Sequence, residues 1–512
     1  MTNNHTISPV AIGYLVTIPL AMVVGFALSN PLSTKSIGIL FMVLSVLASP
    51  IVLRWHHTAL VVSWNAALVI FFLPGQPMLW AVLSGLSLCI SVVSRTIMKK
   101  STFLLVPSVS TPLVILAIVV LATAMLTGGI GGRALGSDMW GAKRYLGVIG
   151  AVMGFFAITA HPIRREDAQI LTGAFLLMGM TAIFADIAYM LGPAFYFLYN
   201  FFPVDLAFHT VASQDTLKRS TGFAWASQAA YWFMLMRYGL RGILDPQKPW
   251  RIVAFFGIFV VGLIGGFRSS IILFGILTIS QFFIEKLHKT RYLPIFAGAS
   301  LIVGMGLIIG ARHLPLSMQR ALSFLPIEVH PMARNDADGT LHWRLEMWRI
   351  VAREVPDYLV LGKGYGFSGT DYVLTQEAIR RGMFRAYEDT LISGNYHNGI
   401  LTLLVPFGLG GFICFCWFIW ASLRVLMRNY RYSPQDLKNI NTFLLAFFLA
   451  RLGFYLVFYG QFDLDLMIFT GTVALSISLN HGVRSRQDLE KDLNPPPEEP
   501  APTPLPNSIP VV

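Results

Sequence analysis

The stretch Leu401–Leu423, LTLLVPFGLGGFICFCWFIWASL, contains no charged side chain. A helix that crosses a membrane needs roughly 20 predominantly apolar residues, and this stretch is long enough. Its apolar residues run on without the two-residue alternation of a membrane barrel, and lipid cannot satisfy the backbone groups of an open strand. Leu401–Leu423 therefore predicts a membrane-spanning helix.

Similar stretches recur from Pro9 nearly to Asn480, in a chain whose residues are 55% hydrophobic and only 12% charged. A water-soluble protein of this length would not have that composition. The sequence predicts an all-α, polytopic helical membrane protein with about 14 transmembrane helices. The expected spans start near Pro9, Ile37, Thr58, Met78, Phe103, Tyr145, Ala168, Thr221, Ile252, Ser269, Tyr292, His397, Ile440 and Leu464.

The formal net charge of +12 could suggest a nucleic-acid partner, but the basic residues lie in short clusters between apolar segments. Clusters of this kind mark cytoplasmic loops by the positive-inside rule. We therefore expect no nucleic acid, the lipid bilayer as surroundings and both termini in the cytoplasm. The clusters that follow alternate spans include Arg95, Lys99 and Lys100; Arg164 and Arg165; Arg237 and Arg241; Arg424, Arg428 and Arg431; and Arg484 and Arg486.

The predicted domain organisation has three parts. Residues 1–200 form an N-terminal transmembrane bundle, and residues 201–482 form a second transmembrane domain. The second domain includes one long external loop, residues 311–396, which is rich in aromatic residues and is expected to fold with short helices. Residues 483–512 end in the Pro-rich stretch PPPEEPAPTPLPNSIP and are expected to be a disordered cytoplasmic tail.

Three separate segments carry candidate site residues on the external side. Arg268 lies in GGFRSS between two apolar runs, where a snorkelling interface residue or an anion site would fit. Arg344 lies in LHWRLEMWRIVAREVPDY, a helix that should end near Pro356. Apolar spacing places Arg344 on the packed side, either in an ion pair with a carboxylate or in a binding site. The stripe expected to pack is Leu341, Leu345, Trp348 and Ala352, and the residues expected on the polar side are Glu346, Arg349 and Arg353.

The third segment is YHNG, where His397 opens a new span at the same external level. A His at a membrane edge is commonly structural, but a neutral imidazole could also accept a proton from a hydroxyl group. The neighbouring Tyr396 and Asn398 add hydrogen-bonding capacity.

Three other features have less specific patterns. The segment VLGKGYGFSG contains Gly362, Gly364 and Gly366 without the strand–turn–helix context of a nucleotide site, and a tight turn is the simpler interpretation. The DLD triplet of Asp463 and Asp465 is expected in an external turn. Asp186 and Arg451 lie within apolar spans, where they could pair across the bundle or line a proton path.

Four motifs together resemble the O-antigen ligase and O-antigen polymerase superfamily of bacterial membrane glycosyltransferases. They are RSTGFAWASQAA from Arg219, GGFRSS, RLEMWRIVAREVPDYLVLGKGYGF and YHNGILTLLVPFGLGG, and they cover about Arg219 to Gly411. Phe267, Ala226 and Ser227 depart from the family pattern, and about 14 spans exceeds the usual dozen or so. Residues 1 to about 200 resemble only a generic helical bundle.

The resemblance implies a metal-independent transferase without a cofactor in the bacterial inner membrane, with its active face in the periplasm. Its donor would be a glycan on undecaprenyl diphosphate, and its acceptor a glycan, a lipid A core or a protein. The resemblance implies that Arg268 and Arg344 hold the diphosphate, that His397 acts near the acceptor hydroxyl, and that Arg219, Tyr396 and Asn398 bind substrate. No metal ligands are implied.

Two other classes of membrane protein remain as alternatives. A lipid-linked glycan flippase or another polysaccharide transporter would commonly show internal repeats and mid-membrane charges. No repeat is evident here, and the distinctive polar residues gather at one face. A metal-dependent transferase that uses a polyprenyl-phosphate sugar would place carboxylates in its first external loop, and residues 29–36 contain none.

Overall fold

The structure is a computed structural model that describes residues 9–29, 34–98, 103–132, 136–204, 219–385 and 387–494. Residues 1–8 lie outside these ranges, and so do residues 495–512, which make up most of the predicted tail. Lys99 and Lys100 of the predicted basic clusters also lie outside them. The chain divides into two compact units, Met1–Ala59 and Leu60–Val512, which are described separately.

The first unit contains α1 (Pro9–Ser29) and most of α2 (Thr34–Ser63). The predicted span that starts at Ile37 lies in α2, which continues past Thr58 and ends at Ser63, and the span predicted from Thr58 is not a helix of its own because residues 64–78 are irregular. The polar residues Arg54–His57 lower the local hydropathy, but none of them is a Gly or Pro that would end a helix. Hydropathy therefore placed the start of a span inside α2.

The second unit is built almost entirely of helices. Its elements are α3 (Leu79–Met98), α4 (Pro107–Leu126), β1 (Met139–Trp140), α5 (Ala142–Thr159), α6 (Ala168–Leu177), η2 (Met178–Ala182), α7 (Ile183–Leu191), η3 (Pro193–Asn200), α9 (Thr221–Ile243), α10 (Trp250–Leu263), α11 (Arg268–Ile284), η5 (Leu287–Lys289), α12 (Tyr292–Ile309), η6 (Ala311–His313), α13 (Leu316–Leu322), α14 (Pro331–Tyr358), β2 (Phe367–Ser368), α15 (Gly369–Arg380), α16 (Glu388–Ser393), α17 (Leu401–Arg431), α18 (Lys438–Val457), α19 (Phe462–Leu479) and α20 (Arg486–Leu493).

Within the described residues, 8 helical segments are long and apolar enough to cross a membrane. They are α3, α4, α5, the run from α6 to α7, α12, α17, α18 and α19. The helices α10 and α11 are apolar but shorter. The structure confirms the all-α, polytopic class, and it does not confirm about 14 spans. The predicted domain boundary near residue 200 stays a prediction. The helices α5 and α19, which come before and after it in the sequence, pack closely together.

The centre of the second unit is packed through glycine residues on α5. Gly150 lies against Trp80 and Ala81 of α3, and Gly154 lies against the ring of Trp64. The Trp64 side chain is fully buried, and its Nε1 donates a hydrogen bond to the carbonyl of Met467 on α19, at 3.3 Å. Small residues let membrane helices approach closely, and here they make room for a tryptophan that links α5 to α19.

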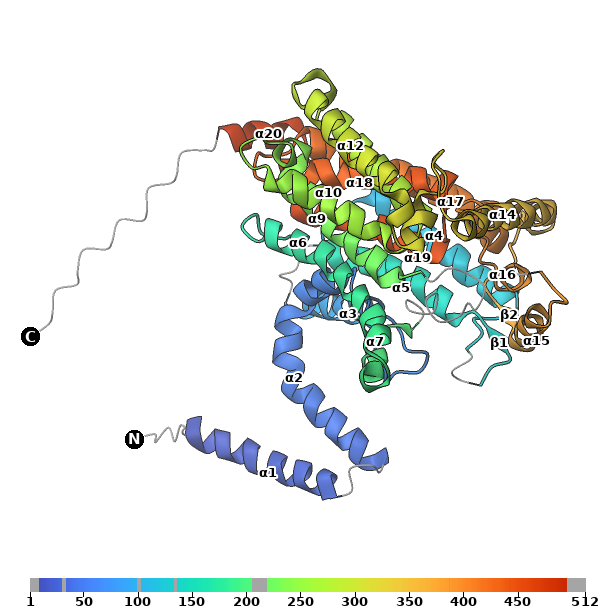
Figure 1. Cartoon of the computed structure of the whole chain (residues 1–512). Coiled ribbons are helices and arrows are strands. Elements are labelled where there is room, and N and C mark those ends of the chain that lie inside the picture. Colours follow the sequence, from blue (N-terminus) through green and yellow to red (C-terminus); the bar gives the residue numbers. More distant parts are fainter. Residues whose placement is uncertain are drawn as a thin grey trace, which may run out of the picture. The chain divides into compact units, whose positions relative to one another are not determined.

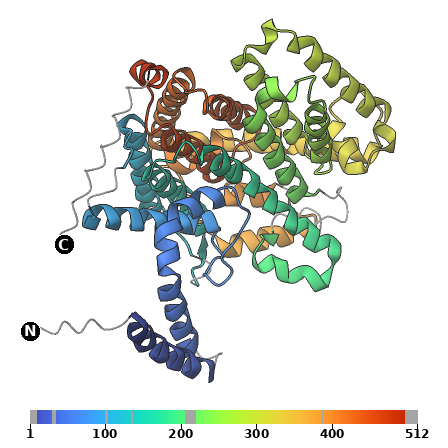
Figure 2. The same cartoon turned by 90° about the vertical axis from the view of Figure 1, so that its left-hand side faces the viewer.

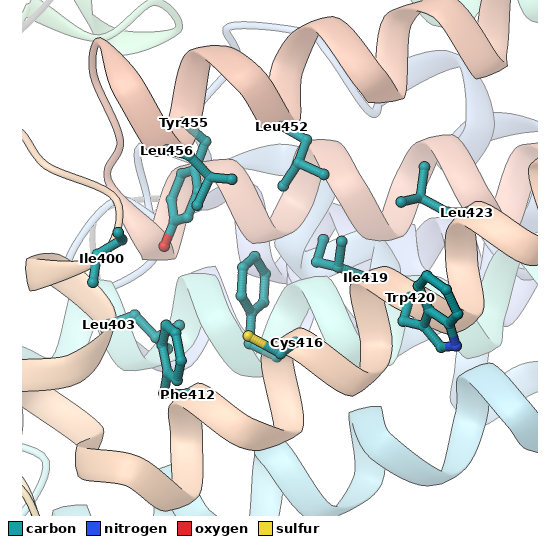
Figure 3. A pocket seen from close by; sticks show the side chains of 11 residues that line it. Ile400, Leu403, Phe412, Cys416, Ile419, Trp420, Leu423, Leu452, Tyr455 and Leu456 are labelled. Carbon is teal, nitrogen blue, oxygen red and sulfur yellow. The ribbon is translucent and has the colours of Figure 1, made fainter.

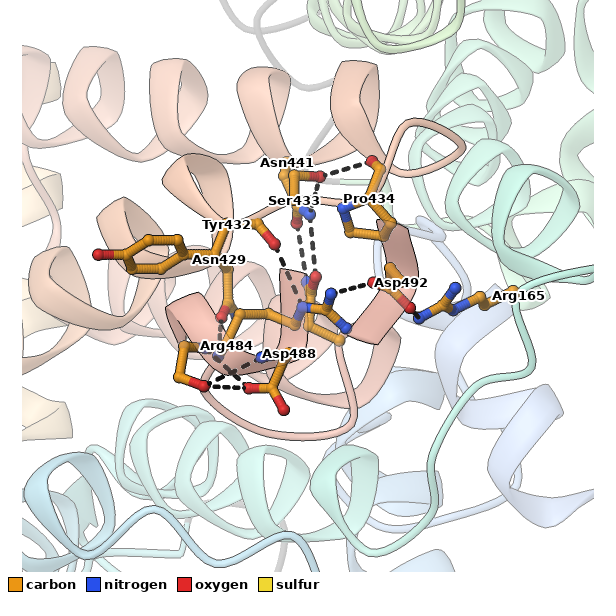
Figure 4. Close-up of polar contacts among 11 residues, drawn as sticks. Arg165, Asn429, Tyr432, Ser433, Pro434, Asn441, Arg484, Asp488 and Asp492 are labelled. Atoms are coloured by element: carbon orange, nitrogen blue, oxygen red, sulfur yellow. Dashed lines mark hydrogen bonds and ion pairs between the residues drawn. The ribbon is translucent and has the colours of Figure 1, made fainter. Parts of the chain in front are cut away.

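A polar cluster ties the last helix, α20, to two loops of the second unit (Figure 4). Asp492 accepts from Arg165 at 2.8 Å and also pairs with Arg484. The backbone N–H of Arg484 donates to Asn429 at 2.9 Å, and Ser485 forms a capping box with Asp488. Residues 486–493 are therefore helical, in place of the irregular start expected for the tail.

The segment between α12 and α17 gathers at one end of the second unit. Figure 1 shows α14, α15, α16, β1 and β2 at the right-hand side. The strands β1 and β2 pair antiparallel, with Met139 opposite Ser368 and Trp140 opposite Phe367. This short ribbon joins the loop before α5 to the long loop. Figure 2 shows the helices of residues 220–322, drawn in green to yellow, at the upper right, and α9 and α11 of this group also pack against α18.

The contact between Gly154 and Trp64 gives a test of the packing. A Cβ atom at Gly154 would overlap the ring of Trp64 and lie 2.7 Å from Oγ of Ser84. We expect Gly154→Val to lower the free energy of unfolding by about 1–3 kcal/mol, because overpacking a filled core forces side chains out of their rotamers. The measurement is the midpoint of thermal unfolding of the purified protein in detergent.

Gly275→Val on α11 is the matched control, because a Cβ atom at Gly275 would have nothing within 4 Å. It makes the same change of residue in another apolar helix and should shift the midpoint much less. Equal shifts for the two variants would contradict the packing described for α5.

Candidate functional site

The helix α14 directs Arg344 toward the body of the protein. Ala333, Ala337, Met347 and Val351 are its buried residues, and Arg344 fits their three- and four-residue spacing. The predicted apolar stripe was wrong, because Leu341, Leu345 and Ala352 are exposed. Apolar side chains are not confined to the core of a membrane protein, so hydropathy alone does not identify the packed face. Arg349 and Arg353 are exposed, as predicted.

Arg344 is surrounded by aromatic rings and other arginines. Its guanidinium carbon lies 5.7 Å from the ring centre of Trp343 and 5.6 Å from that of Tyr459. Within the part of the chain that the structure describes, Arg344 forms no ion pair, and its buried Nε has no hydrogen-bond partner. Burial lowers the pKa of Arg344, and Arg268 and Arg320 add to that effect. Arg344 is therefore a half-buried cation that forms no ion pair with a carboxylate of the described residues.

His397 shares both aromatic neighbours of Arg344. Its ring stacks on Tyr459 with centres 5.1 Å apart, and the edge of Trp343 meets it at 5.7 Å. The backbone at His397 is left-handed, with φ of 51°. This conformation costs roughly 1–2 kcal/mol for a residue other than glycine, and such strain is commonly found at functional sites. The structure thus brings Arg344 and His397, from separate segments, around one tyrosine.

Arg320 joins the surrounding elements, and sequence analysis did not identify it. It lies on α13 and is 3% exposed. Its guanidinium pairs with Asp336, donates to the carbonyl of Gly266 at 2.6 Å and donates to Thr340 at 3.2 Å. These bonds fix α14 against the turn that precedes α11. One signal in the sequence was an arginine within LSMQRAL, an otherwise uncharged helix.

Arg219 and Arg268 complete a cluster of four arginines with Arg320 and Arg344. Arg219 pairs with Asp336 at 3.4 Å, and Arg268 donates to the carbonyl of Ala337 on α14. Burial lowers the pKa of Arg219 to about 10, and the nearby charges of Arg320 and Arg344 contribute. At neutral pH all four side chains are positive, so the cluster attracts anions.

Tyr396 and Asn398, which flank His397, have structural contacts. Tyr396 is 1% exposed, and its carbonyl accepts from Nε1 of Trp348 at 2.7 Å. Oδ1 of Asn398 accepts from the backbone N–H groups of Ile400 and Leu401, both at 3.1 Å, and so caps the start of α17. These contacts hold the backbone on both sides of His397.

The glycine-rich segment 362–366 is a tight turn packed against α17 and α5. The N–H of Gly364 donates to the carbonyl of Pro406 at 2.9 Å, and that of Tyr365 donates to the hydroxyl of Tyr145 at 2.7 Å. Gly362 has φ of 84° and lies directly against the backbone of Pro406. These N–H groups bind protein oxygens, which supports the turn rather than an anion site.

The acidic residues near the site each contact an arginine or a backbone group. Asp463 lies 3.7 Å from Nε of Arg144, and Asp465 accepts from Arg451 at 2.6 Å. Both aspartates are buried in the first turn of α19 rather than exposed in a turn. Arg451 does not pair with Asp186, which accepts from the N–H of Phe223 at 3.0 Å.

An apolar groove lies beside the site, between α17 and α18 (Figure 3). Its volume is about 220 Å³, and its lining includes Ile400, Cys416, Trp420 and Leu456, all exposed. One end of the groove is at Ile400, three residues after His397. The groove continues along α17 as far as Leu423.

Comparison with known proteins connects this geometry to a family. Residues 252–416 match a family model described as O-Antigen ligase. The matched segment contains Arg268, Arg320, Arg344 and His397, whereas Arg219 lies before it. No curated protein gives a significant match to the chain. Residues 252–416, about a third of the chain, are therefore similar to the O-antigen ligase and polymerase superfamily.

Proposed function

We propose that this protein transfers a glycan from undecaprenyl diphosphate to an acceptor hydroxyl group at the periplasmic face of a bacterial inner membrane. The general class, an O-antigen ligase or polymerase type of glycosyltransferase, follows from the matched domain. The acceptor is a growing glycan, a lipid A core or a protein. The donor carrier, the face and the residue roles are the parts that we propose.

The position of Arg344 carries the proposal. A half-buried guanidinium that has no carboxylate partner among the described residues and lies close to three other arginines is energetically unfavourable until an anion binds. A diphosphate carries enough negative charge to offset several of these cations. Arginine also offers parallel N–H donors that match phosphate oxygens.

The same cluster fits the chemistry of a diphosphate leaving group. When the bond between the sugar and the phosphate breaks, the electron pair stays on the phosphate oxygen. Fixed cations near that oxygen stabilise the developing charge, and they need no reorganisation because the protein already holds them in place. In our proposal Arg344, Arg268 and Arg219 bind the diphosphate, while Arg320 holds α14 in position.

His397 suits the acceptor side of the reaction. A neutral imidazole can accept the proton of the acceptor hydroxyl as that oxygen attacks the sugar carbon. Stacking on Tyr459 and the edge contact with Trp343 fix the plane of the ring. Because Tyr459 also contacts Arg344, the proposed base and the proposed diphosphate site lie next to each other.

The groove of Figure 3 offers a place for the polyprenyl chain. Its lining is apolar, and its end at Ile400 is close in the chain to His397. A prenyl chain in this groove would carry its diphosphate toward the arginine cluster. The basic loops at the other end of the helices, including Arg165 and Arg484, would then face the cytoplasm.

The first functional prediction concerns Arg344. We expect Arg344→Ala to lower kcat by about 10²- to 10³-fold, the range observed when one preorganised donor to a developing anion is removed. Arg344→Lys keeps the charge but loses the paired N–H donors, so its activity should also fall. The assay follows transfer from a polyprenyl-diphosphate glycan in liposomes, normalised to folded protein.

Arg349→Ala is the matched control, because Arg349 lies on the exposed side of the same helix. It should keep nearly normal turnover. Full activity of Arg344→Lys would reduce the role of Arg344 to charge alone, and full activity of Arg344→Ala would remove it from the mechanism.

The second functional prediction concerns His397. We expect His397→Ala to slow transfer by about 10²- to 10⁴-fold, the usual contribution of a general base. Binding of the lipid donor, measured by equilibrium binding of labelled donor, should be retained because the arginine cluster is unchanged. His397→Asn serves as a backbone control, since asparagine tolerates the left-handed conformation. Normal turnover in His397→Asn would exclude a proton-transfer role.

The third functional prediction is that metal chelation leaves the activity intact. The cations that we assign to the diphosphate are arginines, and Asp463 and Asp465 each lie against an arginine. Turnover of the purified protein should stay within about twofold after treatment with EDTA, since proposed charge stabilisation comes from the protein. Loss of turnover that Mg²⁺ or Mn²⁺ restores would favour a metal-dependent transferase.

A further inference from the structure

We propose that Arg144 is a positioning residue that acts through His397, and that Asp463 supports it. The inference rests on the proposed function, because it assigns Arg144 to the site in which His397 acts. Arg144 lies in the first turn of α5, far in sequence from the matched domain. Its side chain is 14% exposed, so it belongs to the interior of the protein.

The guanidinium of Arg144 holds the segment that leads to His397. Nη1 donates to the carbonyl of Ser393 at 2.6 Å, and Nη2 donates to the carbonyl of Gly394 at 3.3 Å. Both carbonyls lie at the end of α16, where Gly394 has φ of 71° and turns the chain. His397 follows three residues later. Two hydrogen bonds from one planar guanidinium group thus fix the start of this short segment.

The same guanidinium also reaches the segment that carries Tyr459. Its Nε lies 3.7 Å from Oδ1 of Asp463, which is buried at the start of α19. Tyr459 precedes Asp463 by four residues and stacks on His397. Arg144 therefore connects the backbone before His397 to the helix that follows the stacking partner of His397. The spacing between the imidazole and the phenol depends on both connections.

The remaining contacts of Arg144 keep its side chain in one position. The guanidinium carbon lies 4.6 Å from the ring centre of Tyr365. The next residue, Tyr145, accepts from the N–H of Tyr365 at 2.7 Å. The first turn of α5 thus binds the long loop at two points, residues 365 and 393–394. The ion pair with Asp463 compensates the charge of the buried guanidinium.

Because two N–H groups of Arg144 are bound to carbonyls and its Nε faces Asp463, we assign it no direct contact with substrate. Its effect should appear in the turnover number and not in donor binding, which we assign to the other arginines. A misplacement of about 1 Å can lower a rate by about 10²-fold. We therefore expect Arg144→Ala to lower kcat about 10- to 100-fold, with the donor KM changed less than about twofold.

The deciding experiment is a double-mutant cycle between Arg144 and His397 on the full-length protein in liposomes. If Arg144 acts through His397, then Arg144→Ala should cause little further loss of kcat once His397 is replaced by Ala. A merely structural role would give losses that multiply, and that result would overturn the inference. A wild-type kcat in Arg144→Ala would also overturn it.

Two other variants protect the experiment against misfolding. Arg144→Lys keeps a charge opposite Asp463 but loses the two-carbonyl fork, so its kcat should lie between those of wild type and Arg144→Ala. If Arg144→Ala does not accumulate, the cycle is run with Arg144→Lys. Arg451→Ala is the control, since it breaks the neighbouring buried pair with Asp465 and touches neither Ser393 nor Gly394. A loss of kcat in Arg451→Ala that equals that of Arg144→Ala would contradict the assignment.

The outcome also separates this inference from the proposed function. Absence of glycan transfer by the wild-type protein would show that the proposed function itself fails, and normal turnover in His397→Ala would remove the role of His397 and, with it, this inference. Slow turnover in His397→Ala together with losses that multiply in the double variant would leave the proposed function standing and remove only the role of Arg144.

Discussion

The ion pair between Arg320 and Asp336 is the interaction on which the candidate site depends. It joins α13 to α14 in the interior, and Arg320 also binds the carbonyl of Gly266 before α11. This link holds α14 against the membrane helices together with the hydrogen bond from Arg268 to the carbonyl of Ala337. Asp336 neutralises part of the charge of Arg320 and Arg219, and Arg344 lies two turns further along α14, beyond its reach. Within the described residues, the ion pairs of Asp336 therefore go to Arg320 and Arg219, while Arg268 donates to the carbonyl of Ala337 and Arg344 forms no ion pair.

The arginines of the cluster differ in their surroundings. Arg320 is held on every side by protein groups, whereas Arg344 has aromatic faces around it. An aromatic ring attracts a cation weakly but offers no hydrogen-bond acceptor comparable to a carboxylate. Aromatic neighbours therefore stabilise the charge of Arg344 without occupying its N–H groups as hydrogen-bond acceptors would.

The sequence predicted the class of fold, and it also pointed to Arg268, Arg344 and His397, which the structure brings together in the candidate site. Long apolar runs predict membrane helices, and an isolated arginine such as Arg268 is visible between them. The number of spans was harder to predict, since the polar residues 54–57 lie inside α2 without ending it. Arg344 was placed on the packed face of α14, although Leu341 and Leu345, expected beside it, are exposed. Arg320 and Tyr459 were missed because their contacts join segments far apart in the chain, which no local pattern reveals.

The left-handed backbone at His397 has an evolutionary consequence. Its conformational energy is retained in the folded protein, so His397 is not the residue that would make this position most stable. Glycine would relieve the strain and asparagine would reduce it, but neither carries an imidazole. Selection for stability and selection for the imidazole therefore oppose each other at residue 397. Lineages that lose the need for the imidazole could accept glycine or asparagine here without losing the fold, which is a trade-off between stability and activity at a single position.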